Sequence, residues 1–338
     1  MIPIAIVGLG NCAAALLEGI QYFREEPGAL TGVITPDIGG YKPADIEPVI
    51  AFDIDRKKVG KPIGEAAEFG NQRRMQKPLA FDAVVHSGII SDGLSATSIV
   101  NSIGWDTTPA LIASEIEEAG AKIVVNYLPV GSTEATRQYA AAALLAGAAF
   151  VNCIPVKVAR DPVLAEQFDE ANLPLVGDDI KSQYGATILH RALARIAEER
   201  GITIRDTYQL NVGGNADFRN MLDTSRLQDK KESKTGSVTD VVPVDDECIH
   251  IGPSDFIPHL GDTKVAYINL SMTGFAGAPI ELEARLKVSD SPNSAGIVVE
   301  AVRYAAKALD ENVGGVLDDV SAWLMKAPRN HDAADVAV

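Results

Sequence analysis

The feature that most constrains the fold is an apolar segment that ends in a glycine-rich turn. Ile2–Val7 is continuously apolar, which is typical of a strand buried on both faces of a parallel sheet. The residues that follow, Gly8–Ala13, match the pattern G-x-G-x-x-G/A that leads such a strand into a helix. Gly8 permits the tight turn, and Gly10 lets a pyrophosphate approach the backbone at the positive helix end. The sequence therefore predicts a dinucleotide site with contacts from Gly8, Gly10, Asn11 and Cys12.

A second buried strand, Val49–Phe52, ends in Asp53. A carboxylate at this position accepts hydrogen bonds from the adenosine ribose and repels a 2′-phosphate, so we expect NAD rather than NADP. Asp53 lies 43 residues after Gly10, whereas the usual spacing is about 20 residues. An insertion from Arg24 to Pro48, whose glycine, proline and aspartate content fits a surface loop, explains the excess.

Further short apolar segments alternate with helical patterns, which indicates βαβ units and a doubly wound parallel sheet. After Arg200 the pattern changes to alternation, which is typical of half-buried antiparallel strands. The helical period then returns. We therefore expect an α/β fold: a Rossmann-type domain over residues 1–200, completed by 292–338, with an inserted β-rich α+β domain over 201–291. The segments concerned are Lys122–Asn126, Ala149–Asn152 and Leu173–Val176 (buried strands), and Thr207–Val212, Ala266–Met272 and Ile280–Val288 (alternating).

The chain has 30 basic and 46 acidic side chains among 338 residues, a net charge of −16. Such a field repels nucleic acid and anionic membranes, so neither is an expected partner. An anionic substrate would need a local cluster of cations. Because no apolar run reaches ~18 residues, the N-terminus lacks a basic segment and the three cysteines lack metal-type spacing, we expect a cytoplasmic protein.

Lysines in several separate segments are candidates for that cluster. Lys230 and Lys234 are four residues apart and would share one face of a helix. Lys264 precedes an alternating segment, Lys326 follows a short apolar one, and Asp290 stands between a strand and a helix. Taken alone, such lysines are usually solvated surface charges.

These segments resemble myo-inositol-1-phosphate synthases of the shorter bacterial and archaeal type, along nearly the whole chain. The matching segments, in order, are Gly8–Ala13, Tyr127–Ser132, Gly177–Gln183 with Gly185–Ile188, Leu210–Asn215 with Asp217 and Phe218, Lys230 and Lys231 with Ser233–Thr235, Gly252–Asp255, Asp290–Gly296 and Leu324–Lys326.

The resemblance implies an NAD-dependent, redox-neutral cyclisation of a sugar phosphate. In that family, oxidation at C5 of glucose 6-phosphate acidifies C6, the resulting enolate attacks the C1 aldehyde, and reduction at C5 releases 1D-myo-inositol 3-phosphate. Alkoxide, enolate and aldol oxyanion all carry negative charge, which fixed ammonium groups in a dry cleft stabilise.

The resemblance also assigns roles. It implies catalytic Lys230, Lys234, Lys264, Lys326 and Asp290, with Lys264 or Lys230 transferring the proton at C5 and Lys326 and Lys234 nearer the oxyanion and phosphate. It places Asn215 and Asp217 at the substrate, and Asp178, Asp179 and Ser132 at the cofactor. Helix capping is an alternative role for Asp178, Asp179 and Ser132.

The resemblance further implies that the inserted domain carries catalysis and builds a homotetramer by sheet packing. The scattered histidines give no pair with ligand spacing, so no zinc site is indicated. Whether a cation is needed beside the cofactor phosphates stays open.

Three departures from the family leave the substrate open: Glu232 between the paired lysines, Lys157 and Arg160 in the 153–160 segment, and the segment His86–Gly93. Fructose 6-phosphate is the rival substrate, because the same enolate would attack the C2 ketone and close a five-membered ring. An ordinary NAD-dependent polyol dehydrogenase is an alternative with different chemistry, and a non-catalytic NAD sensor is the third.

Overall fold

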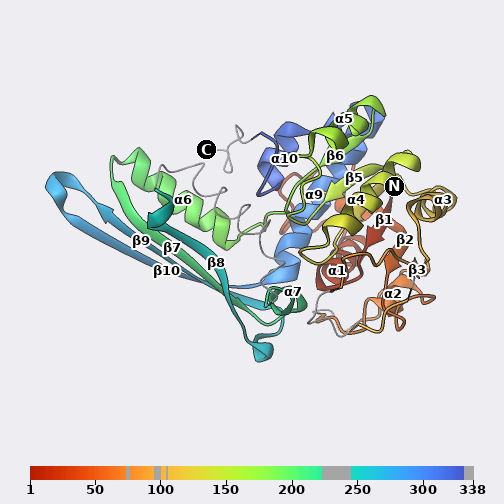
Figure 1. The fold of residues 1–338 in the computed structure, drawn as a ribbon, viewed down its shortest axis with the longest axis horizontal. Coiled ribbons are helices and arrows are strands. Elements are labelled where there is room, and N and C mark those ends of the chain that lie inside the picture. Colours follow the sequence, from red (N-terminus) through yellow and green to blue (C-terminus); the bar gives the residue numbers. More distant parts are fainter. Residues whose placement is uncertain (74–76, 95–99, 104–105, 223–244, 331–338) are drawn as a thin grey trace.

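The computed structural model describes residues 1–73, 77–94, 100–103, 106–222 and 245–330. Figure 1 shows two sheets, and the larger has seven parallel strands in the order β11-β6-β5-β4-β1-β2-β3 within these ranges. This order is that of a Rossmann-type sheet with one added edge strand. The strands are β1 (Ile2–Val7), β2 (Ile46–Asp53), β3 (Val85–Ser87), β4 (Ile123–Asn126), β5 (Ala149–Asn152), β6 (Pro174–Val176) and β11 (Gly315–Val316).

Helices cover both faces of this sheet, because side chains along each strand point alternately to opposite faces. In β1, Ile4 and Ile6 pack in one core with α1 and α9, whereas Ala5 and Val7 pack in another with α3, α4 and α5. The predicted doubly wound α/β fold is thus confirmed. The helices are α1 (Asn11–Glu25), α2 (Ile63–Ala66), α3 (Pro109–Ala119), α4 (Thr133–Leu145), α5 (Pro162–Glu170), α6 (Ala186–Glu199), α7 (Ala216–Asn220), α9 (Asp290–Asp310) and α10 (Asp318–Leu324).

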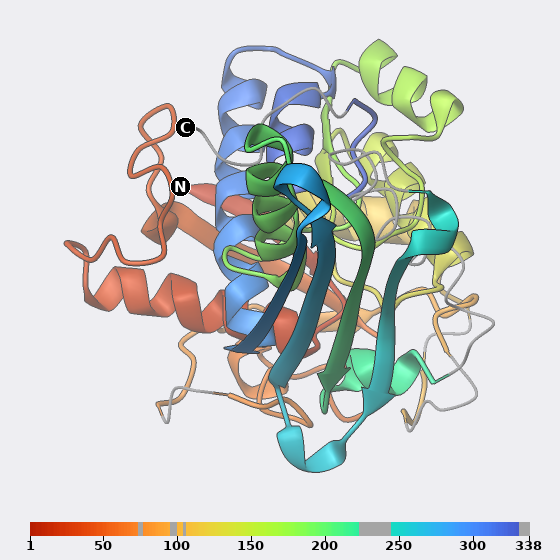
Figure 2. The same cartoon turned by 90° about the vertical axis from the view of Figure 1, so that its left-hand side faces the viewer.

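The second sheet projects from the first and carries α6 on one face (Figures 1 and 2). Its strand order is β10-β9-β7-β8. β9 pairs antiparallel with both β7 and β10, as the alternation predicts, whereas β7 pairs parallel with β8. Although α6 precedes residue 200, it packs on this second sheet. The strands are β7 (Thr203–Gly213), β8 (Ile249–Phe256), β9 (Thr263–Thr273) and β10 (Pro279–Ser289).

The face of β7 toward α6 is polar from Thr207 to Asn211, whereas Ile204 at its start packs in the apolar cluster of α6. Thr207, Gln209 and Asn211 are buried there, while Tyr208 on the opposite face is exposed. The Gln209 amide donates to Asn211 Oδ1 at 3.2 Å, and Asn211 Nδ2 donates to the Gly252 carbonyl at 2.9 Å. Buried polar groups need such partners. In this part of β7 the apolar residues Tyr208, Leu210 and Val212 therefore mark the open face rather than the covered one.

The inserted segment between α1 and β2 is held by a buried ion pair on α9. Arg303 and Glu300 are both fully buried, 2.6 Å apart. Arg303 also donates to the carbonyls of Pro36 and Tyr41, and Glu300 accepts from the Ile34 amide. The predicted loop is thus fastened to the helix that returns from the second sheet. None of the helices in the described ranges combines the length and hydropathy that a bilayer crossing requires.

A buried histidine makes the packing of α6 on β7 depend on pH. His190 Nε2 lies 2.7 Å from Thr207 Oγ1, which donates its own proton to the Asn269 carbonyl, so the ring nitrogen is the donor. Burial lowers the pKa of His190 from 6.5 to about 4. In the unfolded chain the ring protonates first as the pH falls. Stability is therefore lost from about pH 6.5 down to about pH 4, by roughly 3 kcal/mol in all.

We predict that His190→Gln removes most of this loss, as measured by the free energy of unfolding in urea between pH 7 and pH 4. The matched control is His259→Gln, which replaces an exposed histidine and keeps the wild-type slope. A His190→Gln variant with an unchanged slope would assign the acid sensitivity to other groups.

Candidate active site

The glycine turn between β1 and α1 has the geometry of an anion site. Gly8 has φ of +85°, and a Cβ there would lie 2.9 Å from the Tyr127 carbonyl oxygen. At Gly10, the exposed N-cap of α1, a Cβ would meet no atom within 4 Å, and the glycine has no side chain with which to cap the helix. The first amides of α1 are therefore left for a ligand, as a dinucleotide pyrophosphate requires.

Asp53 is held directly against this turn. Its Oδ2 accepts from the Leu9 amide at 2.9 Å and lies 3.4 Å from Lys58 Nζ, while Oδ1 accepts from the Asp55 amide. Lys58 is buried and also donates to the Leu9 carbonyl at 2.7 Å. Lys58 thus fixes both the turn and the carboxylate. Sequence reasoning missed Lys58, since nothing in its spacing separates it from the neighbouring surface lysines.

Lys264 and Asp290 meet where the second sheet joins the first. The Lys264 ammonium lies 3.3 Å from Asp290 Oδ1. Asn215 donates from one amide nitrogen to Asp262 Oδ1 at 3.1 Å and to Asp290 Oδ2 at 3.3 Å. The Asn215 side-chain oxygen, Oδ1, accepts from the Asp217 and Phe218 amides at the start of α7. The structure thus brings predicted Lys264, Asp290, Asn215 and Asp217 together.

Asp262 is a residue of this cluster that the sequence did not reveal. It accepts from the Ser291 hydroxyl at 2.7 Å and from the Ser291 amide at 3.0 Å, and so holds the start of α9. Burial raises the pKa of Asp262, and the charge of Asp290 adds to that rise. A contact of this kind between the start of β9 and α9 depends on the tertiary fold.

Cys12 and Asn11 of the glycine turn join this cluster. The Cys12 sulfur lies 3.9 Å from the Ser291 hydroxyl and 3.8 Å from that of Ser294. Burial and then the charges of Asp290 and Asp217 raise the pKa of Cys12 to about 12. Asn11 Oδ1 accepts from the Gln72 amide at 2.9 Å. The Lys264 cluster therefore adjoins the N-terminus of α1.

The second lysine–carboxylate pair is Lys326 with Asp179, 2.8 Å apart. Their backbones are also paired, because the Lys326 amide donates to the Asp179 carbonyl and Ile180 bridges Met325. Burial, Cys12 and Asp179 raise the pKa of Cys153, whereas Lys326 lowers it. The pair lies against the segment that follows β5, because the Asp179 and Ile180 amides donate to the Ile154 and Cys153 carbonyls.

Asp178 stabilises the loop that follows β5. Its fully buried carboxylate accepts from Asn152 at 2.7 Å, from the amides of residues 158–160 and from Arg160 Nε at 3.3 Å. Burial raises its pKa against these hydrogen bonds. The alternative in which Asp178 or Asp179 caps a helix is wrong, because the next helix begins at Ala186 with Gly185 as its N-cap.

Ser132 is the N-cap residue of α4 by position, but its side chain does not cap the helix. Its hydroxyl donates to the Pro129 carbonyl at 2.7 Å. Asp92 caps α4 instead, accepting from the Glu134 and Ala135 amides at 2.8 and 2.9 Å. The capping alternative for Ser132 is therefore wrong, and a cofactor contact stays a prediction.

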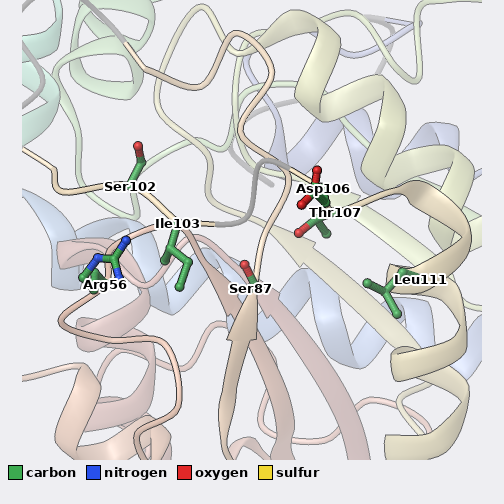
Figure 3. A pocket seen from close by; sticks show the side chains of 7 residues that line it. All are labelled: Arg56, Ser87, Ser102, Ile103, Asp106, Thr107 and Leu111. Atoms are coloured by element: carbon green, nitrogen blue, oxygen red, sulfur yellow. The ribbon is translucent and has the colours of Figure 1, made fainter.

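A cavity of about 400 Å³ opens at the carboxyl end of β3 (Figure 3). Ser87, which lines this cavity, pairs with Asp53 at the end of β2. Lys230, Lys234 and Glu232 lie outside the described residues.

Within the described ranges, no three histidine, cysteine or carboxylate side chains are arranged to hold a metal ion.

A Rossmann-type domain with two lysine–carboxylate pairs beside its glycine turn defines an enzyme on a nucleotide-binding fold. The family model "Myo-inositol-1-phosphate synthase" matches residues 185–291. The inositol-3-phosphate synthase of Mycolicibacterium smegmatis is 45% identical over 346 aligned residues, covering 99% of this chain and 95% of that protein. The chain belongs to the myo-inositol-1-phosphate synthase family, as its sequence motifs predict, and it is an isomerase-class cyclase.

Solved structures agree with this assignment. A myo-inositol-1-phosphate synthase-related protein from Thermotoga maritima aligns with a TM-score of 0.85 and 28% identity, covering 97% of this chain and 93% of that one. The crystal structure of Ari2 aligns with a TM-score of 0.81 and 34% identity, covering 97% and 92% of the two chains.

The position of Lys326 depends on a buried lysine two residues beyond Asp179. Lys181 is 3% exposed and donates to the carbonyls of Ala322 and Trp323, at 2.8 and 3.2 Å, at the end of α10. We predict that Lys181→Met lowers the free energy of unfolding by about 2 kcal/mol, because these carbonyls lose a charged donor. Urea denaturation measures the loss.

The control is Lys307→Met, which removes a partly exposed lysine of α9 that pairs with Glu311. It changes stability by less than about 0.5 kcal/mol. Equal effects of the two substitutions would contradict the role of Lys181.

Proposed function

We propose that this protein catalyses the NAD-dependent, redox-neutral cyclisation of a hexose 6-phosphate, with glucose 6-phosphate as substrate and 1D-myo-inositol 3-phosphate as product. The observation that carries the proposal is the pair of lysine–carboxylate contacts, Lys264–Asp290 and Lys326–Asp179, beside the glycine turn. The names of the curated relatives support the substrate and product.

The residues of the glycine turn fit a dinucleotide. Gly10 leaves space over the uncapped amides of α1, and Asp53 stands at the end of β2 with Lys58 behind it. When bound, NAD supplies the hydride acceptor that makes oxidation at C5 possible and the donor that reverses it. The charge of Asp53 disfavours a 2′-phosphate, which supports NAD over NADP.

Lys264 transfers the C5 proton in this proposal. Its hydrogen bond to Asp290 aims the side chain, and Asn215 holds Asp290 in turn. As hydride leaves C5, the neutral amine form of Lys264 would take the hydroxyl proton, so that C5 becomes a ketone and Lys264 becomes an ammonium group. Lys264 returns the proton to the C5 oxygen when C5 is reduced again, so that the cycle closes without net oxidation.

Lys326 stabilises the negative charge that develops between these two steps. Loss of a C6 proton gives an enolate, and attack on C1 moves the charge onto the former aldehyde oxygen. An ammonium group held at 2.8 Å by Asp179 is already oriented toward one position, so little reorganisation accompanies the change in charge. We assign Lys230 and Lys234 to the substrate phosphate from their motif alone.

The roles of the remaining site residues and the oligomeric state are proposed from the resemblance to the same family. We propose that Asp217 lines the substrate cleft with Asn215, and that Asp178, Asp179 and Ser132 shape the nicotinamide side. We also propose a cytoplasmic homotetramer that assembles through the open face of the second sheet. Tyr208 and Tyr267 are exposed on neighbouring strands of that face, 37% and 43% respectively, and aromatic side chains are common at protein interfaces.

Incubation with NAD and each sugar phosphate tests the reaction. Glucose 6-phosphate is expected to give a six-membered carbocycle with no accumulation of NADH, as followed by carbon NMR and by absorbance. Fructose 6-phosphate is the comparison. A five-membered ring formed from fructose 6-phosphate alone would replace the substrate assignment. Accumulation of NADH with an open-chain product would instead identify a polyol dehydrogenase.

We predict that Lys264→Met lowers kcat at least about 100-fold, because the C5 proton loses its acceptor. NAD affinity, measured by calorimetry, changes less than about threefold. The matched control is Lys122→Met, since Lys122 is exposed and stands immediately before β4. A Lys264→Met enzyme with wild-type kcat would remove this residue from proton transfer.

A further inference from the structure

The segment that follows α2 contacts the glycine turn at two points. The Asn71 side chain donates from Nδ2 to the carbonyls of Leu9 and Ala67, each at 2.9 Å. The backbone amide of Gln72 donates to Asn11 Oδ1 at 2.9 Å. Asn11 is the first residue of α1, whose amides receive the dinucleotide in the proposed reaction. This segment is therefore held in a fixed position relative to a bound cofactor.

The side chain of Gln72 extends from this segment to the second sheet. Its Oε1 accepts a hydrogen bond from the amide of Asp262, in the turn between β8 and β9. The residue before it, Gly261, has φ of +57°, and a Cβ there would overlap Gln72 Oε1. Only glycine allows both this backbone conformation and this close approach. The turn is thus shaped to receive the Gln72 side chain.

The opposite side of the same turn packs tightly on the end of β7. The Ile257 amide donates to the Gly213 carbonyl at 2.9 Å, and a Cβ on Gly214 would overlap the Ile257 carbonyl oxygen. Close-packed structure of this kind transmits a displacement rather than absorbing it. The turn therefore couples the position of Gln72 to that of the second sheet.

Asp262 extends this coupling to the catalytic pair. Its carbonyl accepts from the Asp290 amide at 2.9 Å, and its carboxylate holds Ser291 through two hydrogen bonds. Lys264 follows two residues later in β9 and lies 3.3 Å from Asp290 Oδ1. Direct contacts thus lead from the glycine turn through Gln72 and Asp262 to Lys264.

We propose that Gln72 is a positioning residue that sets the distance between a dinucleotide at the glycine turn and the Lys264–Asp290 pair. The inference rests on the proposed use of NAD, and it concerns a residue outside the segments that carry the family resemblance. Hydride transfer requires the two reacting carbons to be in contact, and a misplacement of about 1 Å can slow such a reaction about 100-fold. Because Gln72 is exposed, replacing it alters this distance without opening a cavity in the core.

The kinetics of Gln72→Ala in the full chain test the inference. We expect kcat for glucose 6-phosphate to fall about tenfold, less than the limit above because Ser291 and Asn215 still hold Asp262. The KM for glucose 6-phosphate and the calorimetric Kd for NAD change less than about threefold, because neither ligand loses a contact. Gln72→Glu keeps kcat within about threefold, because its carboxylate still accepts from the Asp262 amide. Gln167→Ala, which replaces an exposed glutamine on α5, is the matched control and keeps the wild-type kcat.

Hydrogen exchange gives a second readout that does not depend on turnover. In the unmodified protein, NAD is expected to slow the exchange of amides in residues 257–264 as well as in the glycine turn. In Gln72→Ala, this protection remains in the glycine turn and is lost from residues 257–264. Wild-type kcat in Gln72→Ala, or protection of residues 257–264 that persists in it, would overturn the inference alone. Failure of the unmodified protein to bind NAD or to convert glucose 6-phosphate would instead overturn the proposed function.

Discussion

The site depends on one half-buried carboxylate, Asp262, which joins the two sheets of the protein. It holds Ser291 at the start of α9 through two hydrogen bonds and receives the amide of Asn215 from the end of β7. Asp290, the neighbour of Ser291, is thereby fixed opposite Lys264. Because buried charges are costly unless they are hydrogen bonded, this cluster forms only when both sheets are in place. Folding of the second sheet and assembly of the site are therefore one event.

The net charge of −16 explains why the lysines are paired. In an acidic protein an anionic sugar phosphate is repelled at long range, so attraction must come from charges at short distance. Asp179 and Asp290 orient their lysines but also cancel part of the positive charge. In the proposed reaction, each pair thus holds its lysine in a fixed orientation and stabilises the negative charge that develops on the substrate. Other cations must attract the dianionic phosphate.

The sequence predicted what local patterns encode. The glycine turn, the buried strands of the first sheet and the alternation in β9 and β10 follow from spacing alone, and resemblance supplied Lys264, Lys326 and Asp290. It could not predict Asp262, Lys58, Asp92 or Lys181, because their partners lie on distant elements. The sequence also could not predict that the polar face of β7 is the buried one. Apolar alternation shows that a strand has two different faces, but tertiary packing decides which of them is covered.

The chemistry assigned to Lys264 and Lys326 is common to glucose 6-phosphate and fructose 6-phosphate, so ring size must be decided elsewhere. The two cations that depart from the family are obvious candidates, yet Arg160 is already committed to Asp178 and to the Pro155 carbonyl. Replacing it would change the 152–160 loop before it changed any contact with a sugar. Arg160 therefore gives no ground for choosing between a C1 aldehyde and a C2 ketone.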